Sequence, residues 1–474
     1  MTTSPDPRII ARSDHAISRK DIDPDTLRVL YKLKEAGFQS YLVGGAVRDL
    51  LMGRKPKDFD IATDARPNEL RRLFRNSRIV GRRFRLVHVF FGHKNVEVAT
   101  LRSAVVPTDG DSDLYVEDDN QWGDLESDAF RRDFTCNALF YDIRDFAVID
   151  YTGGVADLHD HLVRCIGDPQ VRFQEDPVRM LRAIKFAARF GYKIEAETDT
   201  AIHDLQAELL KASRFRVTEE IFRILTQANR EAGLRMLADY GFLGVLYPDW
   251  LAAIGDEGFA QVCDYFAAVD VAAAEERFFP LEILATGLFI PLLDSVDLSK
   301  DHYNKVAARV TADIRSLGMQ MDLPKRLING VIEMLRGQLY LLFFHHMQKR
   351  VQRFVDSDWF DPVWQVHQLA FGRMEELAPV REVWMQARRA IRKPIGGHDE
   401  SPDKRDIFSF RGKTGGGRHD GHGDGGGGGG GGQGRGGRGG RGGQGRGGQG
   451  RGRGHNDDDA GEGAGASAME AEGF

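Results

Sequence analysis

The 474-residue sequence predicts an α+β protein in three parts: a head with a mixed sheet, an all-α neck and body, and a disordered tail rich in Gly and Arg. Residues 25–150 mix helical and strand-like patterns, whereas residues 175–395 show helical periods and few strand signals. Of the 55 glycines, 31 fall in the last 63 residues, Gly412–Phe474. A segment of that composition cannot bury a core, so we expect it to be disordered.

The elements of the head follow from hydrophobic periodicity and from turn residues. In chain order we expect a helix over 25–36, a strand over 41–43, a helix over 46–52, a strand over 57–63, a helix over 67–75 and a hairpin of 85–91 with 95–101. The acidic segment 104–128 has little periodicity, and we predict a loop there.

Changes in composition and in the pattern of expected helices and strands along the chain predict five segments. They are an N-terminal extension (1–24), the α+β head (25–160), a helical neck (161–230), an all-helical body (231–400) and the Gly/Arg-rich tail (401–474). No repeat of fixed period is evident, so a solenoid is not expected.

Composition excludes several classes of protein. The three cysteines, Cys136, Cys165 and Cys263, have no CxxC spacing, which argues against a disulfide scaffold and against a Cys-based zinc site. The first 20 residues are charged and lack the apolar core of a secretory signal. The longest apolar stretch noted, residues 283–293, is too short to cross a bilayer. We therefore expect a cytoplasmic protein with no membrane span.

The formal net charge of −6 conceals segments of strongly opposite charge. Residues 66–94 carry nine Lys or Arg and one acid, and residues 109–128 carry nine acids and no base. In the tail, residues 433–454 carry six arginines and no acid. Basic segments of this kind indicate polyanion binding at chosen places, although a solvated surface gives the same pattern.

Two neighbouring patterns suggest a site for a metal and a phosphate. Gly44-Gly45 lies between a strand and a helix, where absent side chains let a phosphate approach the backbone and Arg48 adds a charged donor. Asp58 and Asp60 are two residues apart, so in a strand both carboxylates share one face and would repel unless a cation lies between them. Such oxygen ligands suit Mg²⁺. Taken alone, Gly44-Gly45 could be only a tight turn, and Asp58 with Asp60 could be only a solvated Asp-x-Asp sequence.

Two further clusters carry polar groups at helical spacing. Asp133 and Asn137 are four apart and could share a helical face, although Arg131-Arg132-Asp133 also reads as charge compensation after the acidic segment. Asp176 before a proline is a good helix start, and Arg179 and Arg182 follow it on one face. A carboxylate beside a guanidinium can read the edge of a base, but a local structural ion pair is equally consistent with this pattern.

Together these runs resemble a known family. LVGGAVRDLL, KDFDIAT, RRDFTCNAL and EDPVRMLRA, in this order, are similar to the class II nucleotidyltransferases, which comprise CCA-adding enzymes and bacterial poly(A) polymerases. Residues 79–89 and 15–22 resemble segments typical of the bacterial poly(A) polymerases. The resemblance is strong over residues 15–250, weak over 250–395 and absent from the tail. It implies a nucleotidyltransferase head, a neck that recognises the base and a body that binds RNA.

The resemblance also implies roles for individual residues. Asp58 and Asp60 would hold Mg²⁺, and either Asp133 or Glu97 would complete the site. The implied nucleotide-binding residues are Gly44, Gly45, Arg48, Asn137, Asp176, Arg179 and Arg182. The basic run would hold RNA through Arg82, Arg83 and Arg85. Outside the family resemblance, the Arg-Gly-Gly units of the tail resemble RNA-binding RGG boxes and would contact RNA through Arg435, Arg438 and Arg441, with a solubilising linker as the alternative. One departure is Phe215-Arg216, where CCA-adding relatives tend to have Glu-Arg.

The expected reaction is template-independent addition of AMP from ATP to RNA 3′ ends, serving RNA processing or decay, with RNA-decay proteins as candidate partners. CCA addition to tRNA precursors is the alternative within the family. An RNA-binding protein with an inactive nucleotidyltransferase domain is the alternative from another class, but all three expected aspartates are present. His159-Asp160-His161 lacks further ligands nearby and is expected to be a solvated turn rather than a metal site.

Overall fold

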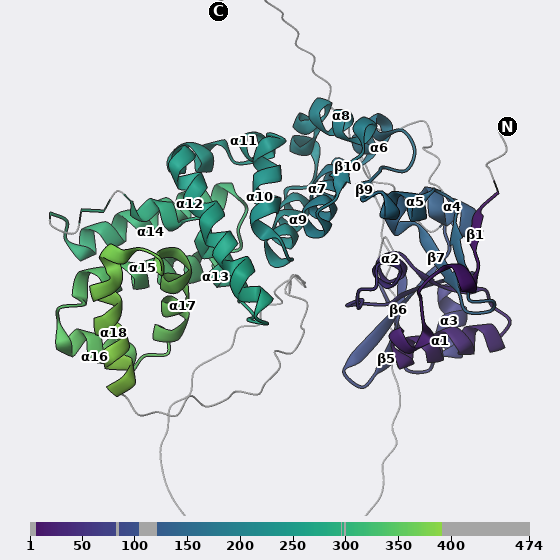
Figure 1. The fold of residues 1–474 in the computed structure, drawn as a ribbon, viewed down its shortest axis with the longest axis horizontal. Coiled ribbons are helices and arrows are strands. Elements are labelled where there is room, and N and C mark those ends of the chain that lie inside the picture. The colour runs from purple at the N-terminus through teal and green to yellow at the C-terminus, as the bar shows by residue number, and fades with distance from the viewer. Residues whose placement is uncertain (1–5, 82–84, 104–120, 295, 298–299, 391–474) are drawn as a thin grey trace, which may run out of the picture. The chain divides into compact units, whose positions relative to one another are not determined.

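The computed structural model of the chain describes residues 6–81, 85–103, 121–294, 296–297 and 300–390. The chain divides into two units, Met1–Phe408 and Ser409–Phe474, and every described residue belongs to the first. The predicted tail and most of the predicted acidic loop lie outside the described residues. Figure 1 shows the mixed sheet of the head and the helices that follow it.

An eight-stranded sheet organises the head. Its strands are β1 (Arg8–Ile10), β2 (Ser40–Val43), β3 (Asp60–Thr63), β4 (Ser77–Val80), β5 (Leu86–Phe91), β6 (Lys94–Thr100), β7 (Leu139–Asp142) and β8 (Val148–Asp150). The strand order is β1-β8-β7-β2-β3-β6-β5-β4. Strands β3 and β6 pair in parallel and the other neighbours are antiparallel, so the predicted mixed sheet is confirmed. A second, two-stranded sheet pairs β9 (Leu162–Val163) with β10 (Lys193–Ile194).

Short helices pack on or connect the strands of the head. They are α1 (Pro24–Glu35), α2 (Gly45–Leu51), α3 (Pro67–Leu73), α4 (Leu125–Phe130) and α5 (Gly154–His159). Helix α1 shows why such a segment forms. Asp23 accepts the Asp25 and Thr26 backbone N–H groups, Pro24 occupies the first turn, and Leu30 and Leu33 are fully buried.

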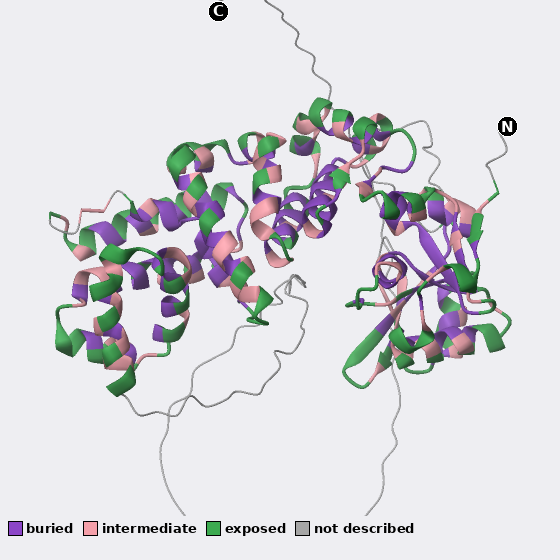
Figure 2. Cartoon of the chain, in the orientation of Figure 1, coloured by how far each residue is buried: buried purple, intermediate pink, exposed green. Residues whose placement is uncertain are grey.

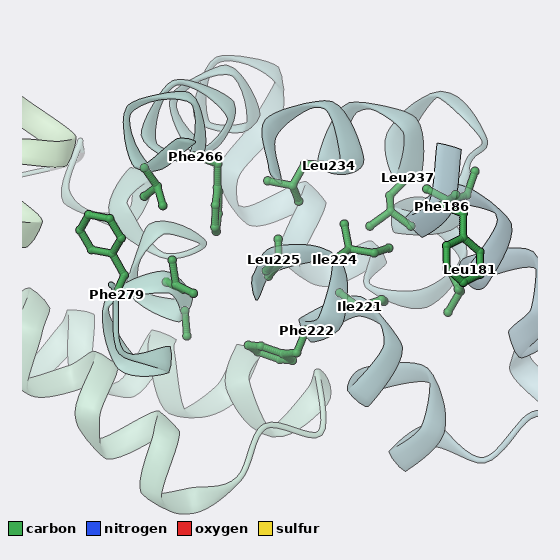
Figure 3. Packing of buried hydrophobic residues seen from close by; sticks show 14 of the residues in the cluster. Leu181, Phe186, Ile221, Phe222, Ile224, Leu225, Leu234, Leu237, Phe266 and Phe279 are labelled. Carbon is green, nitrogen blue, oxygen red and sulfur yellow. The ribbon is translucent and has the colours of Figure 1, made fainter. Parts of the chain in front are cut away.

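From residue 169 to residue 390 the chain is mainly helical. Its helices are α6 (Pro169–Glu175), α7 (Val178–Phe190), α8 (Ala196–Asp204), α9 (Arg214–Thr226), α10 (Arg230–Asp239), α11 (Phe242–Leu246), α12 (Pro248–Ala274), α13 (Leu281–Gly287), α14 (Tyr303–Gln320), α15 (Lys325–Phe344), α16 (Gln348–Val355), α17 (Phe360–Phe371) and α18 (Ala378–Ala390). Figure 2 shows buried residues along their inner sides and exposed residues outside. In Figure 3, Leu181 and Phe186 of α7 lie in the same apolar packing as Ile221 of α9 and Leu234 of α10. The prediction that this part of the chain is mainly helical is therefore confirmed.

Helix α15 has a property that the sequence analysis missed. By length and composition it could cross a membrane, unlike the shorter run 283–293 singled out from sequence. However, 61% of its apolar window is buried, and Leu335 and Leu339 are fully enclosed by other parts of the chain. Burial of this kind is typical of a core helix of a folded protein, because the apolar side chains already have protein partners.

The structure modifies two details of the sequence analysis and leaves the domain boundaries untested. Residues 8–10, assigned to an N-terminal extension, form the edge strand β1 and pair with β8. Helix α4 begins at Leu125, inside the segment predicted to be a loop. One cluster of buried apolar side chains includes both Ile10 of β1 and Trp384 of α18. Because this cluster is continuous across the proposed boundaries at residues 160 and 230, those boundaries stay predictions.

Candidate active site

The loop that leaves β2 favours glycine at its first position. Gly44 has φ +67° and ψ −129°, and a Cβ built there would lie 3.2 Å from Arg132 Nη1. Its N–H donates to the Leu139 carbonyl of β7 at 3.1 Å, which fixes the loop to the sheet. A side chain at this position would be strained and crowded, which explains why a residue without a side chain occupies it.

Asp60 begins β3 directly beside this loop. In register it pairs with Val43 of β2 on one side and with Glu97 of β6 on the other. Partners in register project to the same face of a sheet, so the Asp60 and Glu97 carboxylates share a face. Asp58 precedes β3, so the prediction that both aspartates lie within the strand was wrong for Asp58.

The electrostatics of Asp60 show concentrated negative charge. The pKa of Asp60 is raised to about 6. The largest cause is that the surrounding head removes part of the hydration of this carboxylate, although the residue is exposed. Repulsion from Glu97 and then from Asp58 acts in the same direction, while Arg132 opposes the shift. A bound cation would relieve this repulsion.

These carboxylates fit a magnesium ion that is shared with a substrate. Mg²⁺ prefers oxygen ligands and in nucleotide sites commonly uses one or two carboxylates together with substrate phosphates. Within the described ranges, no three His, Cys, Asp or Glu side chains are gathered closely enough to form a complete metal cage. The donor set therefore suits an ion that arrives with a triphosphate better than a resident structural ion.

Asp133 has different surroundings. Its Oδ1 accepts from Arg179 Nε at 3.0 Å, and its Oδ2 pairs with Arg182. Burial disfavours its charged form, but the charges of Arg182 and Arg179 outweigh that effect and lower the pKa of Asp133. Asp133 thus holds two arginines of α7, whereas Glu97 is the carboxylate in register with Asp60.

The predicted helical face shared by Asp133 and Asn137 is not present. Phe134 between them is extended, with φ −132° and ψ 143°, and only Thr135–Asn137 form a short 3₁₀ helix. The Asn137 side-chain oxygen instead accepts a hydrogen bond from Arg48. The i,i+4 argument fails because the backbone between the two residues is not helical.

Arg48 supports the loop from inside the protein. It is only 3% exposed, and its Nε and Nη2 donate to Asp49 at 2.9 and 2.8 Å. Its guanidinium also lies 4.5 Å from the centre of the Phe190 ring. Because Asp49, Asn137 and Phe190 engage it, contact between Arg48 and a phosphate stays a prediction.

The base-reading residues proposed from sequence lie where α6 meets α7. Asp176 directly follows the last residue of α6, and α7 begins at Val178 rather than at the predicted Pro177. The Asp176 carboxylate pairs with Arg216 of α9 at 2.7 Å, and Arg179 pairs with Glu175 at 2.9 Å. Fixed donors and acceptors are therefore present on α6, α7 and α9 together.

Arg132 is a site residue that the sequence analysis passed over as charge compensation. It donates to Asp128 Oδ2 at 2.9 Å and to the Asn137 carbonyl at 3.2 Å, and its charge acts on Asp60. The one signal available from sequence was its place beside Asp133 in the Arg-Arg-Asp run. Nothing in the spacing shows that Arg132 would approach Gly44.

The predicted RNA-binding arginines are only partly covered by the structure. Arg85 is exposed just before β5, at the end of the basic run. The other residues of this group, Arg82, Arg83, Arg435, Arg438 and Arg441, lie outside the described residues.

Comparison with known proteins agrees with this architecture. Residues 40–164 match the model of the poly A polymerase head domain, and residues 191–254 match a probable RNA and SrmB-binding site of polymerase A. The chain is 39% identical over 336 residues to poly(A) polymerase I of Salmonella typhi, which covers 67% of this chain and 72% of that protein. The chain belongs to the poly(A) polymerase I family. It is therefore a nucleotidyltransferase of the adenylyltransferase type.

Further relatives place the chain within this family. Poly(A) polymerase I of Escherichia coli O6:H1 is 46% identical over 252 residues, covering 52% of this chain and 54% of that protein. The CCA-adding enzyme of Lactobacillus helveticus is 38% identical over 207 residues, covering 43% and 50%. Among solved structures, a tRNA-processing enzyme with CTP aligns with a TM-score of 0.54 at 24% identity, covering 77% of this chain and 93% of that one. This last similarity shows the fold.

Proposed function

We propose that this member of the poly(A) polymerase I family adds AMP from ATP to RNA 3′ ends without a template. The observation that carries the proposal is the pairing of Asp60 with Glu97 beside the Gly44 loop, in a chain that shares 37–46% identity with poly(A) polymerases I. In this reaction the 3′-hydroxyl oxygen of RNA bonds to the α-phosphorus of ATP. The bond from that phosphorus to pyrophosphate breaks, pyrophosphate leaves, and the proton of the hydroxyl is released to water.

The metal site of this proposal consists of Asp58, Asp60 and Glu97. A magnesium ion held by these carboxylates would neutralise charge on the triphosphate and would lower the pKa of the attacking hydroxyl. Glu97 rather than Asp133 completes the set, because Glu97 neighbours Asp60 in register while two arginines engage Asp133.

Other residues position the nucleotide. Gly44 and Gly45 would present backbone without side chains to the triphosphate, and Arg48 together with Asn137 keeps that loop in place. On the neck, Asp176, Arg179 and Arg182 present fixed hydrogen-bonding groups to the base. Asp133 contributes by orienting both of those arginines.

The proposal also includes binding of the RNA backbone away from the reacting 3′ end. The family model over 191–254 and the exposed Arg85 support a path for the RNA backbone, whose affinity should fall as salt is added. The role of the tail arginines, a cytoplasmic location and RNA-decay partners stay predictions.

Transfer of labelled AMP to an RNA with ATP as the sole nucleotide tests the proposed function. We expect incorporation that depends on magnesium and on Asp58. Absence of incorporation by the full chain would overturn the proposal.

A further inference from the structure

A pocket of the head lies on the face of the sheet opposite the proposed metal site. Tyr141 of β7 pairs in register with Leu42, whereas the preceding Phe140 pairs with Val43, the neighbour of Asp60. Because successive strand residues point to opposite faces, Tyr141 and Asp60 lie on different sides of the sheet. The pocket has a volume of about 360 Å³ and is lined by Arg12, Ser18, Arg19, Lys20, Tyr141 and Phe146.

The N-terminal segment that lines this pocket is held firmly. His15 links it to the sheet: its Nε2–H donates to the Phe146 carbonyl at 2.8 Å, and its Nδ1 accepts from the Ile17 N–H at 3.2 Å. The Arg19 guanidinium lies 4.6 Å from the centre of the Phe146 ring and donates to the Tyr31 hydroxyl at 3.0 Å. The Arg19 guanidinium is therefore pre-organised by these contacts.

The pocket gathers positive charge without a matching carboxylate. Arg12, Arg19 and Lys20 all line it, and in the part of the chain that the structure describes none of these three forms a salt bridge. Arg12 donates to the His15 carbonyl at 3.1 Å, which orients the guanidinium but leaves its charge unpaired. All three residues are exposed, so an anion can reach them from solvent.

Tyr141 supplies a second and independent observation. Its side chain is completely buried, yet its hydroxyl has no hydrogen-bond partner among the described residues. Burial raises the pKa of Tyr141, while the charges of Arg12 and Arg19 oppose that shift, so both guanidinium groups act on the hydroxyl. An unsatisfied buried hydroxyl destabilises the folded protein, and a ligand oxygen in the pocket would satisfy it.

We propose that this pocket binds a phosphoryl group, with Arg12, Arg19 and Lys20 neutralising its charge and the Tyr141 hydroxyl donating to one of its oxygens. A phosphoryl group offers several oxygens in different directions, as the converging donors of this pocket require. The volume admits one or two such groups. The source is a free anion such as pyrophosphate or a phosphate of the RNA backbone.

The test is calorimetric titration of the full chain with pyrophosphate in metal-free buffer. The variant Arg12→Gln/Lys20→Gln removes two cations of the pocket, and Arg8→Gln/Lys34→Gln removes two exposed cations of the same part of the chain. Binding of pyrophosphate at the proposed active site contributes equally to both proteins. We expect the pocket variant to bind at least about tenfold more weakly than wild type, and the control to stay within about twofold.

A second variant separates binding from folding. Tyr141→Phe removes a hydroxyl that has no partner, so without pyrophosphate its Tm should equal or exceed that of wild type. With pyrophosphate, its Tm should rise less than that of wild type. Repeating the titration with an oligoadenylate that carries a 5′-hydroxyl distinguishes the sources, because the pocket variant weakens RNA binding only if the RNA backbone enters the pocket. Equal pyrophosphate affinity in wild type and Arg12→Gln/Lys20→Gln would overturn the proposal, as would a full Tm rise in Tyr141→Phe.

Discussion

Asp60 and Glu97 are partners in register across the parallel pair of β3 and β6, and their carboxylates share one face of the sheet. Negative charge is therefore concentrated beside Gly44, which follows the last residue of β2. Glu97 also lies 3.4 Å from His88 of β5, measured from its Oε1 to Nε2. This row across three strands is the structural basis of the proposed metal site.

Removing a carboxylate of the metal site should abolish the reaction. We expect Asp58→Ala and Glu97→Gln each to lower AMP incorporation at least about 10³-fold, because the charge that holds magnesium is lost, while RNA affinity stays near that of wild type. Single-turnover AMP transfer and filter binding measure the two effects. Glu35→Gln, at the exposed end of α1, is the control. Full activity in Glu97→Gln would show that Glu97 is not a metal ligand.

The Gly44 loop offers a matched pair of glycines. Gly44 and Gly53 both have φ +67°, but a Cβ at Gly44 meets Arg132 at 3.2 Å whereas a Cβ at Gly53 enters open space. Both alanine variants should lose about 1 kcal/mol of stability from backbone strain. Gly44→Ala should in addition raise KM for ATP about tenfold by displacing the loop. Equal KM values in the two variants would argue against a triphosphate at Gly44.

Nucleotide choice should depend on Asp176. Asp176→Asn keeps the size of the side chain but removes its ion pair with Arg216, so we expect the preference for ATP over CTP in kcat/KM to fall about tenfold. The control is Glu219→Gln, which removes another arginine pair on α9. A preference that is unchanged in Asp176→Asn but altered in Glu219→Gln would place base recognition elsewhere.

Acid should destabilise the body through His367. This side chain is completely buried, and its Nδ1–H donates to Gln338 Oε1 at 3.1 Å, while Nε2 has no partner among the described residues. Burial, with a contribution from Arg381, lowers the pKa of His367 to about 4. The unfolded chain therefore binds a proton between pH 6.5 and 4 that the folded chain does not. Stability is lost as the pH falls through this window, by up to about 3 kcal/mol.

The variant His367→Gln isolates this effect. Denaturant unfolding followed by tryptophan fluorescence reports it, since Trp364 stacks on His367 at 5.3 Å. We expect a weaker dependence of the unfolding free energy on pH in His367→Gln than in wild type, and no change in exposed His159→Gln. The same dependence in His367→Gln as in wild type would contradict this assignment.

The sequence predicted most of the fold because the relevant signals are local. The helix over 25–36, the strand before Gly44 and the hairpin around residue 92 each follow from periodicity and turn residues within a few positions. The failures are nonlocal. Only the strand register shows that Glu97 neighbours Asp60, and only the packed structure shows that Arg132 approaches Gly44. The spacing of Asp133 and Asn137 misled because spacing predicts a shared face only where the backbone is helical.

The most direct test of the central claim is the product ladder at single-nucleotide resolution. The full chain is incubated with an RNA bearing a free 3′-hydroxyl and with ATP alone, CTP alone, or both. Template-independent polyadenylation predicts a long ladder of added A residues with ATP alone and no comparable extension with CTP. Addition of C and then A, followed by a stop and requiring both nucleotides, would contradict the account and identify a CCA-adding reaction instead.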